Sequence, residues 1–183
     1  MIQNGLNKLF LGFLFIMIGF RIQGFDIFPD IVGYILFAFG FSNLGSSSNY
    51  FIKAARYNIP MIVLSIFSIY QPTVQGGGIQ PEPLGLVGIL LSIASFILNL
   101  LVVYNLFKGI NELEYSQGNT ELALESDRKW SQYLMLQLAV LFSFIIIFIP
   151  FLAILYMIAM LIASIAVLIV IMGFIKRCMD SIN

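Results

Sequence analysis

Histidine is absent from this chain of 183 residues, and cysteine occurs once, as Cys178. The absence of histidine removes the commonest protein metal ligand and the usual general base at neutral pH. A single cysteine excludes an internal disulfide and a C-x-x-C redox pair. The sequence therefore predicts no metal site, no catalytic residue and no bound cofactor.

Charged residues are also scarce, at 10% of the chain, whereas an ordinary soluble domain has roughly 25%. Hydrophobic residues make up 60%, and the mean hydropathy is +0.99. A soluble fold cannot bury this much apolar surface, so we expect an integral membrane protein whose main partner is the lipid bilayer. The formal net charge is zero and the basic residues are scattered, which argues against a nucleic-acid partner.

Enzyme motifs are missing as well. Neither a G-x-S-x-G nucleophile motif nor the paired acidic motif of a lipid phosphotransferase occurs in the sequence. Asp26 and Asp30 lie four residues apart with Pro29 between them, which leaves an aspartate-based hydrolase open without supporting it. An enzyme is therefore the least supported class of function.

Apolar segments alternate with breaks of glycine, proline or charged residues. This pattern predicts an all-α integral membrane bundle of six transmembrane helices in three antiparallel hairpins, as one domain over residues 1–183. The expected helices cover about 5–22, 31–44, 59–71, 84–107, 130–149 and 151–175. The apolar core between Lys8 and Arg21 would span only ~20 Å, against a hydrocarbon thickness of ~30 Å. No small-residue cleavage site follows it, so we expect this segment to remain in the mature protein.

Basic residues predict the orientation in the membrane. If the N-terminus is cytoplasmic, eight of the nine basic residues lie on the cytoplasmic side and only Arg21 lies outside. The inner set is Lys8, Lys53, Arg56, Lys108, Arg128, Lys129, Lys176 and Arg177. The positive-inside rule therefore favours a topology with both termini inside.

Glycines in the first two expected helices recur at a spacing of two helical turns. Gly12 and Gly19 share one face of the first helix, and Gly33 and Gly40 share one face of the second. Small residues allow the backbones of membrane helices to approach closely. The spacing therefore predicts that the first helix packs tightly against the second.

Turn residues predict where the remaining helices are connected. Residues 45–49 read as a loop, Gly118 as the turn of a charged connection, and Pro150 as the break between the last two helices. Residues 50–57 carry aromatic and basic side chains and are interpreted as an interfacial segment. The third helix is then expected to begin near Pro60, because proline is tolerated in a first turn.

A stripe of small and polar residues lies along the fourth expected helix. Gly88, Ser92, Ser95 and Asn99 are spaced so that they share one face. Such a stripe is most often a seam between packed membrane helices. The second interpretation is the polar wall of a cavity, and Asn99 would distinguish the two because its amide needs a partner in hydrocarbon.

Charged side chains cluster near the connection between the first two helices, on the predicted outer side. If these helices are short, the side chains sit in a depression roofed by residues 71–83. The candidate ligand-binding residues are Arg21, Asp26, Asp30, Tyr34, Glu82 and Asn99. Arg21 would anchor an anionic group, and the carboxylates would select amines or hydroxyls. The structural alternative is that Arg21 pairs with Asp26 or Asp30 and only pins the connection.

The longest polar stretch runs from Lys108 to Lys129 and mixes acidic with basic side chains. We expect the fourth helix to extend past the membrane, turn at Gly118 and return as the fifth. The stretch is interpreted as a solvated face. A docking surface for a soluble or membrane protein partner is the alternative.

The stretch from Gly24 to Leu36 reads G-F-D-I-F-P-D-I-V-G-Y-I-L. It resembles a segment, F-D-I-L-P-D-(I/F)-I-G-Y, of uncharacterised small multi-pass membrane proteins of Firmicutes-type bacteria, which follows an N-terminal hydrophobic run. The match covers about Leu9 to Leu44. The resemblance implies location in a bacterial cytoplasmic membrane and brings no activity with it.

In size and predicted topology the chain is also similar to the substrate-binding S-components of energy-coupling-factor vitamin transporters. Those proteins have six helices, both termini inside and a ligand pocket that opens outward. Their alanine motif in the first helix, which docks the coupling subunit, is absent here; Gly5 and Leu9 hold the comparable positions. The resemblance implies ligand binding, and the missing motif argues against coupling to an ATPase module.

Two functions follow from these observations. The first is a small-molecule binding or transport module of the cell membrane with an outward-facing polar site. The second is a non-catalytic membrane subunit or scaffold that binds partner proteins.

Overall fold

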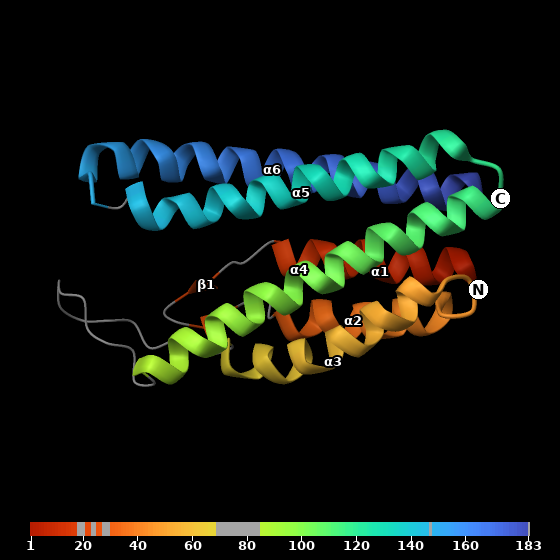
Figure 1. The fold of residues 1–183 in the computed structure, drawn as a ribbon, viewed down its shortest axis with the longest axis horizontal. Coiled ribbons are helices and arrows are strands. Elements are labelled where there is room, and N and C mark those ends of the chain that lie inside the picture. The colour runs from red at the N-terminus through yellow and green to blue at the C-terminus, as the bar shows by residue number, and fades with distance from the viewer. Residues whose placement is uncertain (18–20, 23–24, 27–29, 69–84, 147, 183) are drawn as a thin grey trace.

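The computed structural model describes residues 1–17, 21–22, 25–26, 30–68, 85–146 and 148–182. Within these ranges the chain forms six helices, which confirms the all-α class (Figure 1). They are α1 (Ile2–Met17), α2 (Asp30–Leu44), α3 (Asn49–Ser68), α4 (Gly85–Ser116), α5 (Thr120–Ile146) and α6 (Pro150–Ser181). Two short strands, β1 (Arg21–Ile22) and β2 (Phe25–Asp26), pair antiparallel between α1 and α2.

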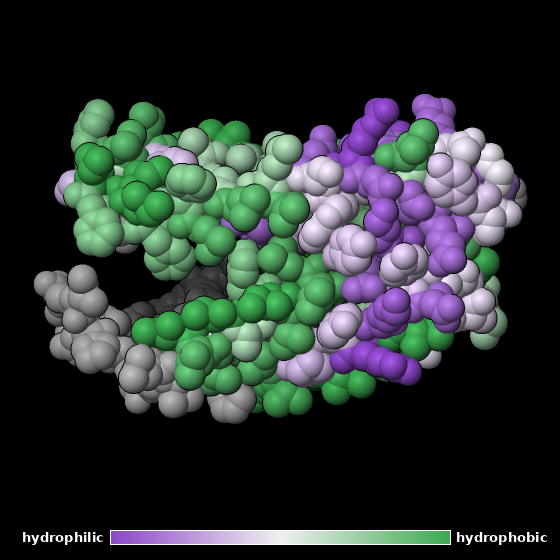
Figure 2. Space-filling view, in the orientation of Figure 1, coloured by the Kyte–Doolittle hydropathy of each residue, from purple (hydrophilic) through white to green (hydrophobic). Residues whose placement is uncertain are grey.

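The helices form a ring. Each helix contacts the next along the chain, and α6 also contacts α1. Figure 1 shows both termini at one end of the bundle, together with the α2–α3 and α4–α5 turns. We call this the polar end, because Figure 2 shows hydrophilic residues gathered over it and hydrophobic residues over most of the remaining described surface. The opposite end, where α5 connects to α6, is the apolar end.

Three helices are long and apolar enough to cross a membrane: Gly88–Ser116 within α4, all of α5 and all of α6. These agree with the membrane class predicted from composition. Helices α1 and α2, with 16 and 15 described residues, are shorter, at ~24 and ~22 Å. The α5–α6 hairpin exposes large apolar side chains at the apolar end, and Phe148 and Phe151 are each 83% exposed. Hydrocarbon, and not water, is the solvent that suits this surface.

The start of α3 corrects the sequence interpretation. The helix begins at Asn49 rather than near residue 59, and Pro60 lies in its interior. Ser48 provides the N-terminal cap, because its Oγ accepts a hydrogen bond from the Tyr50 backbone N–H at 3.1 Å. The aromatic and basic side chains of residues 50–57 fit a helix as well as an interfacial segment, and the cap favours the helix.

The predicted extension of the fourth helix past its apolar part, with a turn at Gly118 and a return as the fifth, is confirmed, since α4 continues to Ser116 and α5 begins at Thr120. The end of the last helix was predicted too early, because α6 continues to Ser181 rather than ending near 175. The predicted bounds described only the apolar parts. The charged extensions of α4 and α5 pair with one another, as the 3.0 Å ion pair between Lys108 Nζ and Asp127 Oδ1 illustrates.

The predicted turns after α2, α4 and α5 are confirmed. Helix α2 ends at Leu44, and α6 begins at Pro150. The α4–α5 turn uses Gly118, whose φ of +83° lies in the left-handed region that other residues rarely adopt. The turn reverses the chain so that α5 returns alongside α4.

Close packing of α1 against α2 is confirmed by the glycines that fall within the described residues. A Cβ added to Gly33 would lie 2.8 Å from the Gly12 carbonyl oxygen, and one added to Gly40 would lie 3.1 Å from the Gly5 carbonyl oxygen. Only glycine allows the two backbones to approach this closely. Gly19 lies outside the described residues.

Phenylalanine rings fill the core next to the contact between α1 and α2. This phenylalanine layer consists of Phe13, Phe37, Phe41, Phe51 and Phe107, each at most 1% exposed. The ring centroids of Phe13 and Phe37 are 5.4 Å apart, and those of Phe37 and Phe41 are 5.5 Å apart. Four helices contribute rings, so the layer closes the middle of the bundle toward the polar end.

Candidate functional site

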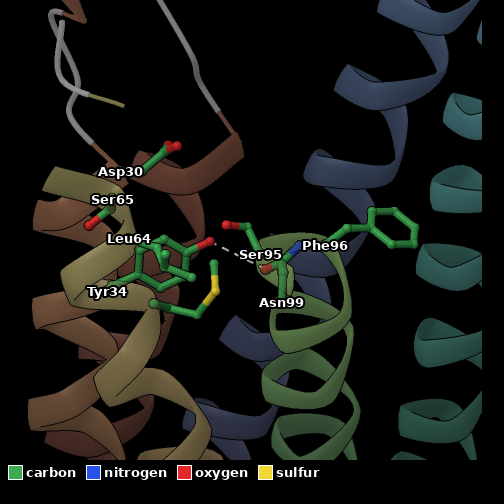
Figure 3. A pocket seen from close by; sticks show the side chains of 8 residues that line it. Asp30, Tyr34, Leu64, Ser65, Ser95, Phe96 and Asn99 are labelled. Atoms are coloured by element: carbon green, nitrogen blue, oxygen red, sulfur yellow. Dashed lines mark hydrogen bonds between the residues drawn. The ribbon is translucent and has the colours of Figure 1, made fainter. Parts of the chain in front are cut away.

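A hollow of about 230 Å³ lies between α2, α3 and α4 (Figure 3). Its α2 residues come before Phe37 in the helix, so it lies on the apolar-end side of the phenylalanine layer. Eight residues line it: Asp30 and Tyr34 from α2, Met61, Leu64 and Ser65 from α3, and Ser95, Phe96 and Asn99 from α4. The pairs Asp30–Tyr34 and Ser95–Asn99 are each spaced by four residues, so each pair lies on one face of its helix. Two helices therefore present polar stripes to one space.

Asn99 connects three helices through its side chain. Its Nδ2 donates a hydrogen bond to the Tyr133 hydroxyl of α5 at 2.7 Å. The Tyr34 hydroxyl of α2 donates to Asn99 Oδ1 at 3.5 Å, a long bond that Figure 3 marks with a dashed line. The half-buried amide thus has hydrogen-bond partners on both its nitrogen and its oxygen. The 3.5 Å hydrogen bond from Tyr34 is the weaker of the two. Breaking it to form a hydrogen bond between Asn99 and a ligand would therefore cost less free energy.

Ser65 and Phe96 contribute little polarity to the hollow. The Ser65 hydroxyl donates to the Ile62 carbonyl oxygen at 2.8 Å. Figure 3 shows the Phe96 ring pointing away from Tyr34 and the Ser95 hydroxyl pointing toward it. The groups that can contact a ligand are therefore a carboxylate, a phenol, an alcohol and a carboxamide. They can form hydrogen bonds and hold one positive charge, but they contain no paired nucleophile and base.

Asn58, in α3, contacts the backbone of the site residue Tyr34 and was not predicted from the sequence. It is fully buried, and its Nδ2 donates to the Tyr34 backbone carbonyl at 2.7 Å, which joins α3 to α2. Its Oδ1 has no hydrogen-bond partner among the described residues. The available signal was an asparagine two residues before Pro60, at the edge of an apolar run, but residues 50–57 beside it were assigned to the interface.

The structure brings together three of the six predicted site residues, namely Asp30, Tyr34 and Asn99. Arg21 and Asp26 are opposite one another in the β1–β2 ladder, and their side chains lie outside the description. Glu82 and the predicted roof lie outside the described residues.

The polar stripe of α4 divides between two environments. Ser95 and Asn99 line the hollow. Ser92 is exposed and donates to the Gly88 carbonyl oxygen at 2.9 Å. Part of the stripe therefore matches the cavity-wall interpretation. Because Ser92 and Ser95 share one face of the helix, the sequence pattern did not predict that only Ser95 lines the hollow.

The charged residues at the polar end, beyond the apolar parts of the helices, pair mainly with one another. Glu125 Oε1 accepts from Arg177 at 2.5 Å and from Lys129 at 3.1 Å. Burial acts to raise the pKa of Glu125, but the hydrogen bonds and charges of these two cations outweigh it and hold the pKa below its usual value. The hydrogen bond to Asp127 likewise raises the pKa of Lys108.

Comparison with known proteins gives no relative for this chain. No protein-family model matches it, and no curated protein or solved structure does so either. Its function must therefore be argued from its own residues.

Proposed function

We propose that the chain is a multi-pass protein of the cell membrane that binds a small polar molecule in the hollow between α2, α3 and α4. The observation that carries the proposal is the convergence of Asp30, Tyr34, Ser95 and Asn99 on one hollow within an otherwise apolar bundle. Polar groups at this depth cost free energy unless they serve packing or binding. The protein is then a binding module, or the binding part of a transporter.

The proposed topology has all six helices inserted and both termini in the cytoplasm. The polar end, with both termini and the charged turns, is then cytoplasmic, and the hollow opens toward the outside. Single-cysteine variants test this placement with a membrane-impermeant maleimide in intact cells. Ile149→Cys, in the α5–α6 turn, should be labelled, whereas Gln117→Cys, in the α4–α5 turn, should be labelled only after the cells are lysed. The reverse pattern would invert the topology.

The phenylalanine layer supports a site with access from one side only. Phe37 and Phe41 follow Tyr34 by about one and two turns of α2, and both are at most 1% exposed. A molecule in the hollow would meet these rings before it reached the polar end. Transport across the membrane would therefore require the rings to separate, whereas binding alone would not.

The size and chemistry of the hollow limit the ligand. A volume of about 230 Å³ is below the ~300–1,000 Å³ of pockets for drug-sized ligands. The ligand is therefore a compact molecule that forms several hydrogen bonds. Asp30 is the one charged group that lines the hollow within the described part of the chain, and its carboxylate can accept hydrogen bonds from N–H or O–H groups of the ligand.

Native mass spectrometry of the protein, extracted in mild detergent from its own membrane, tests the proposal. We expect a small non-lipid adduct that Ser95→Met abolishes by filling the hollow. Ser92→Met is the matched control, because Ser92 lies on the same helix but is exposed. An adduct that survives Ser95→Met, or its absence from the unaltered protein, would contradict the proposal. Arg21→Ala, if folded, tests whether Arg21 takes part in binding.

The partner-binding alternative has weaker support. It requires charged side chains between Lys108 and Lys129 that are available to another protein. Lys108, Glu125, Asp127 and Lys129 already pair with residues of this chain. A protein that co-purifies with the chain in the absence of any small adduct would favour this alternative.

A further inference from the structure

A second hollow, of about 550 Å³, lies between α1 and α6 at the polar end. It is lined by Gln3, Asn4, Asn7 and Phe10 of α1 and by Lys176, Met179 and Asp180 of α6. The first turn of α1 therefore faces the last turns of α6 across this space. The hollow lies at the other end of the bundle from the candidate site and shares no residue with it.

Two charged side chains that line this hollow form no ion pair with the described residues. Lys176 and Asp180 are exposed and enter no ion pair with the residues that the structure describes. Lys108, Lys129 and Arg177, at the same end, are all paired. A cation and an anion one helical turn apart thus face an open space lined by carboxamides.

Along one face of α6, the side chains change from apolar to charged toward this hollow. Ile169, Gly173, Lys176 and Asp180 follow one another at spacings of three or four residues, so they lie along one stripe about 16 Å long. Ile169 is 65% exposed, and a Cβ on Gly173 would have no neighbour within 4 Å. Toward the polar end, the stripe therefore presents an exposed apolar side chain at Ile169, free space at Gly173, a cation at Lys176 and an anion at Asp180.

We propose that this hollow binds the headgroup of a bilayer phospholipid that carries both a phosphate and a primary amine, as phosphatidylethanolamine does. The order of groups along the lipid is acyl chain, glycerol, phosphate and amine, which matches the order of groups along the stripe. The lipid lies with its acyl chains in the hydrocarbon beside Ile169 and its headgroup at the polar end. Phe10 and Met179, both half-buried, form an apolar floor.

The contacts follow from charge and hydrogen-bonding capacity. Lys176 and the side-chain amides of Asn4 and Asn7 donate to the phosphate oxygens. Asp180 accepts hydrogen bonds from the primary ammonium group, close to the negative end of α6.

This arrangement predicts selectivity among headgroups. A choline group carries a positive charge but no N–H, so it cannot donate a hydrogen bond to Asp180. A glycerol headgroup lacks the positive charge, and the lipid's net negative charge is then repelled by Asp180. Phosphatidylethanolamine should therefore be retained in preference to phosphatidylcholine and phosphatidylglycerol.

The test uses the full chain in vesicles that contain equal amounts of these three lipids. The protein is extracted in mild detergent, and native mass spectrometry measures the lipids that remain bound. We expect phosphatidylethanolamine to be enriched about two- to five-fold over phosphatidylcholine, which is the range of a partly exposed ion pair. Lys176→Gln should reduce retention of all three lipids. Asp180→Asn should abolish the preference for the ethanolamine headgroup.

Matched variants at the same end control for loss of charge. Lys53→Gln removes a lysine that lies over the Tyr50 ring, away from the hollow, and Glu121→Gln removes an exposed carboxylate of α5. Both should keep the wild-type lipid profile, and far-UV circular dichroism should verify that every variant is folded. Retention of the three lipids in bulk proportion, or equal effects of Asp180→Asn and Glu121→Gln, would overturn the proposal. Displacement of the lipid by millimolar soluble phosphoethanolamine would overturn the assignment to a membrane lipid.

Discussion

Replacing Gly33 with alanine should destabilise the bundle by forcing α1 and α2 apart. The new Cβ would lie 2.5 Å from Ile16 Cγ1 and 2.8 Å from the Gly12 carbonyl oxygen. Ile16 can change its rotamer, but the backbone oxygen cannot move without its helix. Since ordinary contact begins at 3.4 Å, the backbones must separate locally by about 0.6 Å.

The magnitude follows from two opposing effects. Overpacking of a tight contact costs about 1–3 kcal/mol. Alanine is a better helix former than glycine by up to about 1 kcal/mol, and this gain offsets part of that cost. Gly173→Ala isolates the second effect, because a Cβ at Gly173 meets nothing within 4 Å. The difference between the two variants should therefore equal the packing cost, about 1–3 kcal/mol.

Unfolding in mixed micelles of mild detergent and dodecyl sulfate can measure this difference. Trp130 is the only tryptophan, and its ring centroid lies 5.2 Å from that of Tyr104, so its fluorescence reports on the fold. Gly33→Ala should unfold at a lower fraction of dodecyl sulfate than the wild type, and Gly173→Ala at the same or a higher fraction. Equal stability of Gly33→Ala and Gly173→Ala would refute the backbone contact between α1 and α2.

Three further predictions concern the α4–α5 region. Ser126→Ala should cost about 1 kcal/mol in the same unfolding assay, because the buried Ser126 hydroxyl donates to the Phe107 carbonyl oxygen at 2.7 Å. The Asn119 side-chain amide donates to the buried Glu114 carboxylate at 3.0 Å, so Glu114→Leu, which removes this acceptor, should lower the free energy of unfolding by about 1–3 kcal/mol. Glu114→Gln keeps an acceptor oxygen and should lower it less. Equal losses in the two variants would contradict this account. The folded-state pKa of Glu125 is lowered, so its stabilising effect is complete above the unfolded-state pKa of ~4.3 and is lost as the pH falls through the folded-state value. Unfolding measured from pH 7 to pH 3 should therefore show a loss of stability on acidification that Glu125→Gln reduces.

Local signals in the sequence predicted the turns well. Gly118 and Pro150 act through their own backbone geometry, so their effect does not depend on distant residues. The start of α3 was missed because two local signals compete there. Pro60 favours a helix start, but the Ser48 cap lies twelve residues earlier and determines the boundary.

The candidate site was predictable in part. Asp30 and Tyr34 are close in sequence, and Asn99 was selected because an amide in an apolar helix needs a partner. Their meeting in one hollow depends on contacts between α2 and α4, whose residues Tyr34 and Asn99 are 65 positions apart. Asn58 was not predicted, because its burial depends on how α3 packs against α2.

The amino-acid sequence by itself determined the membrane class, the helical content and the polarity of the two ends. These properties are sums over residues, since transfer into hydrocarbon is nearly additive along the chain. The tertiary structure alone decided that α6 closes the ring against α1 and that Ser95 lines a hollow while Ser92 does not. It also decided that Lys176 and Asp180 line the second hollow without an ion pair to any described residue. Each of these depends on the rotation of one helix against another, which is fixed by side-chain packing between distant segments and not by the pattern of any one segment.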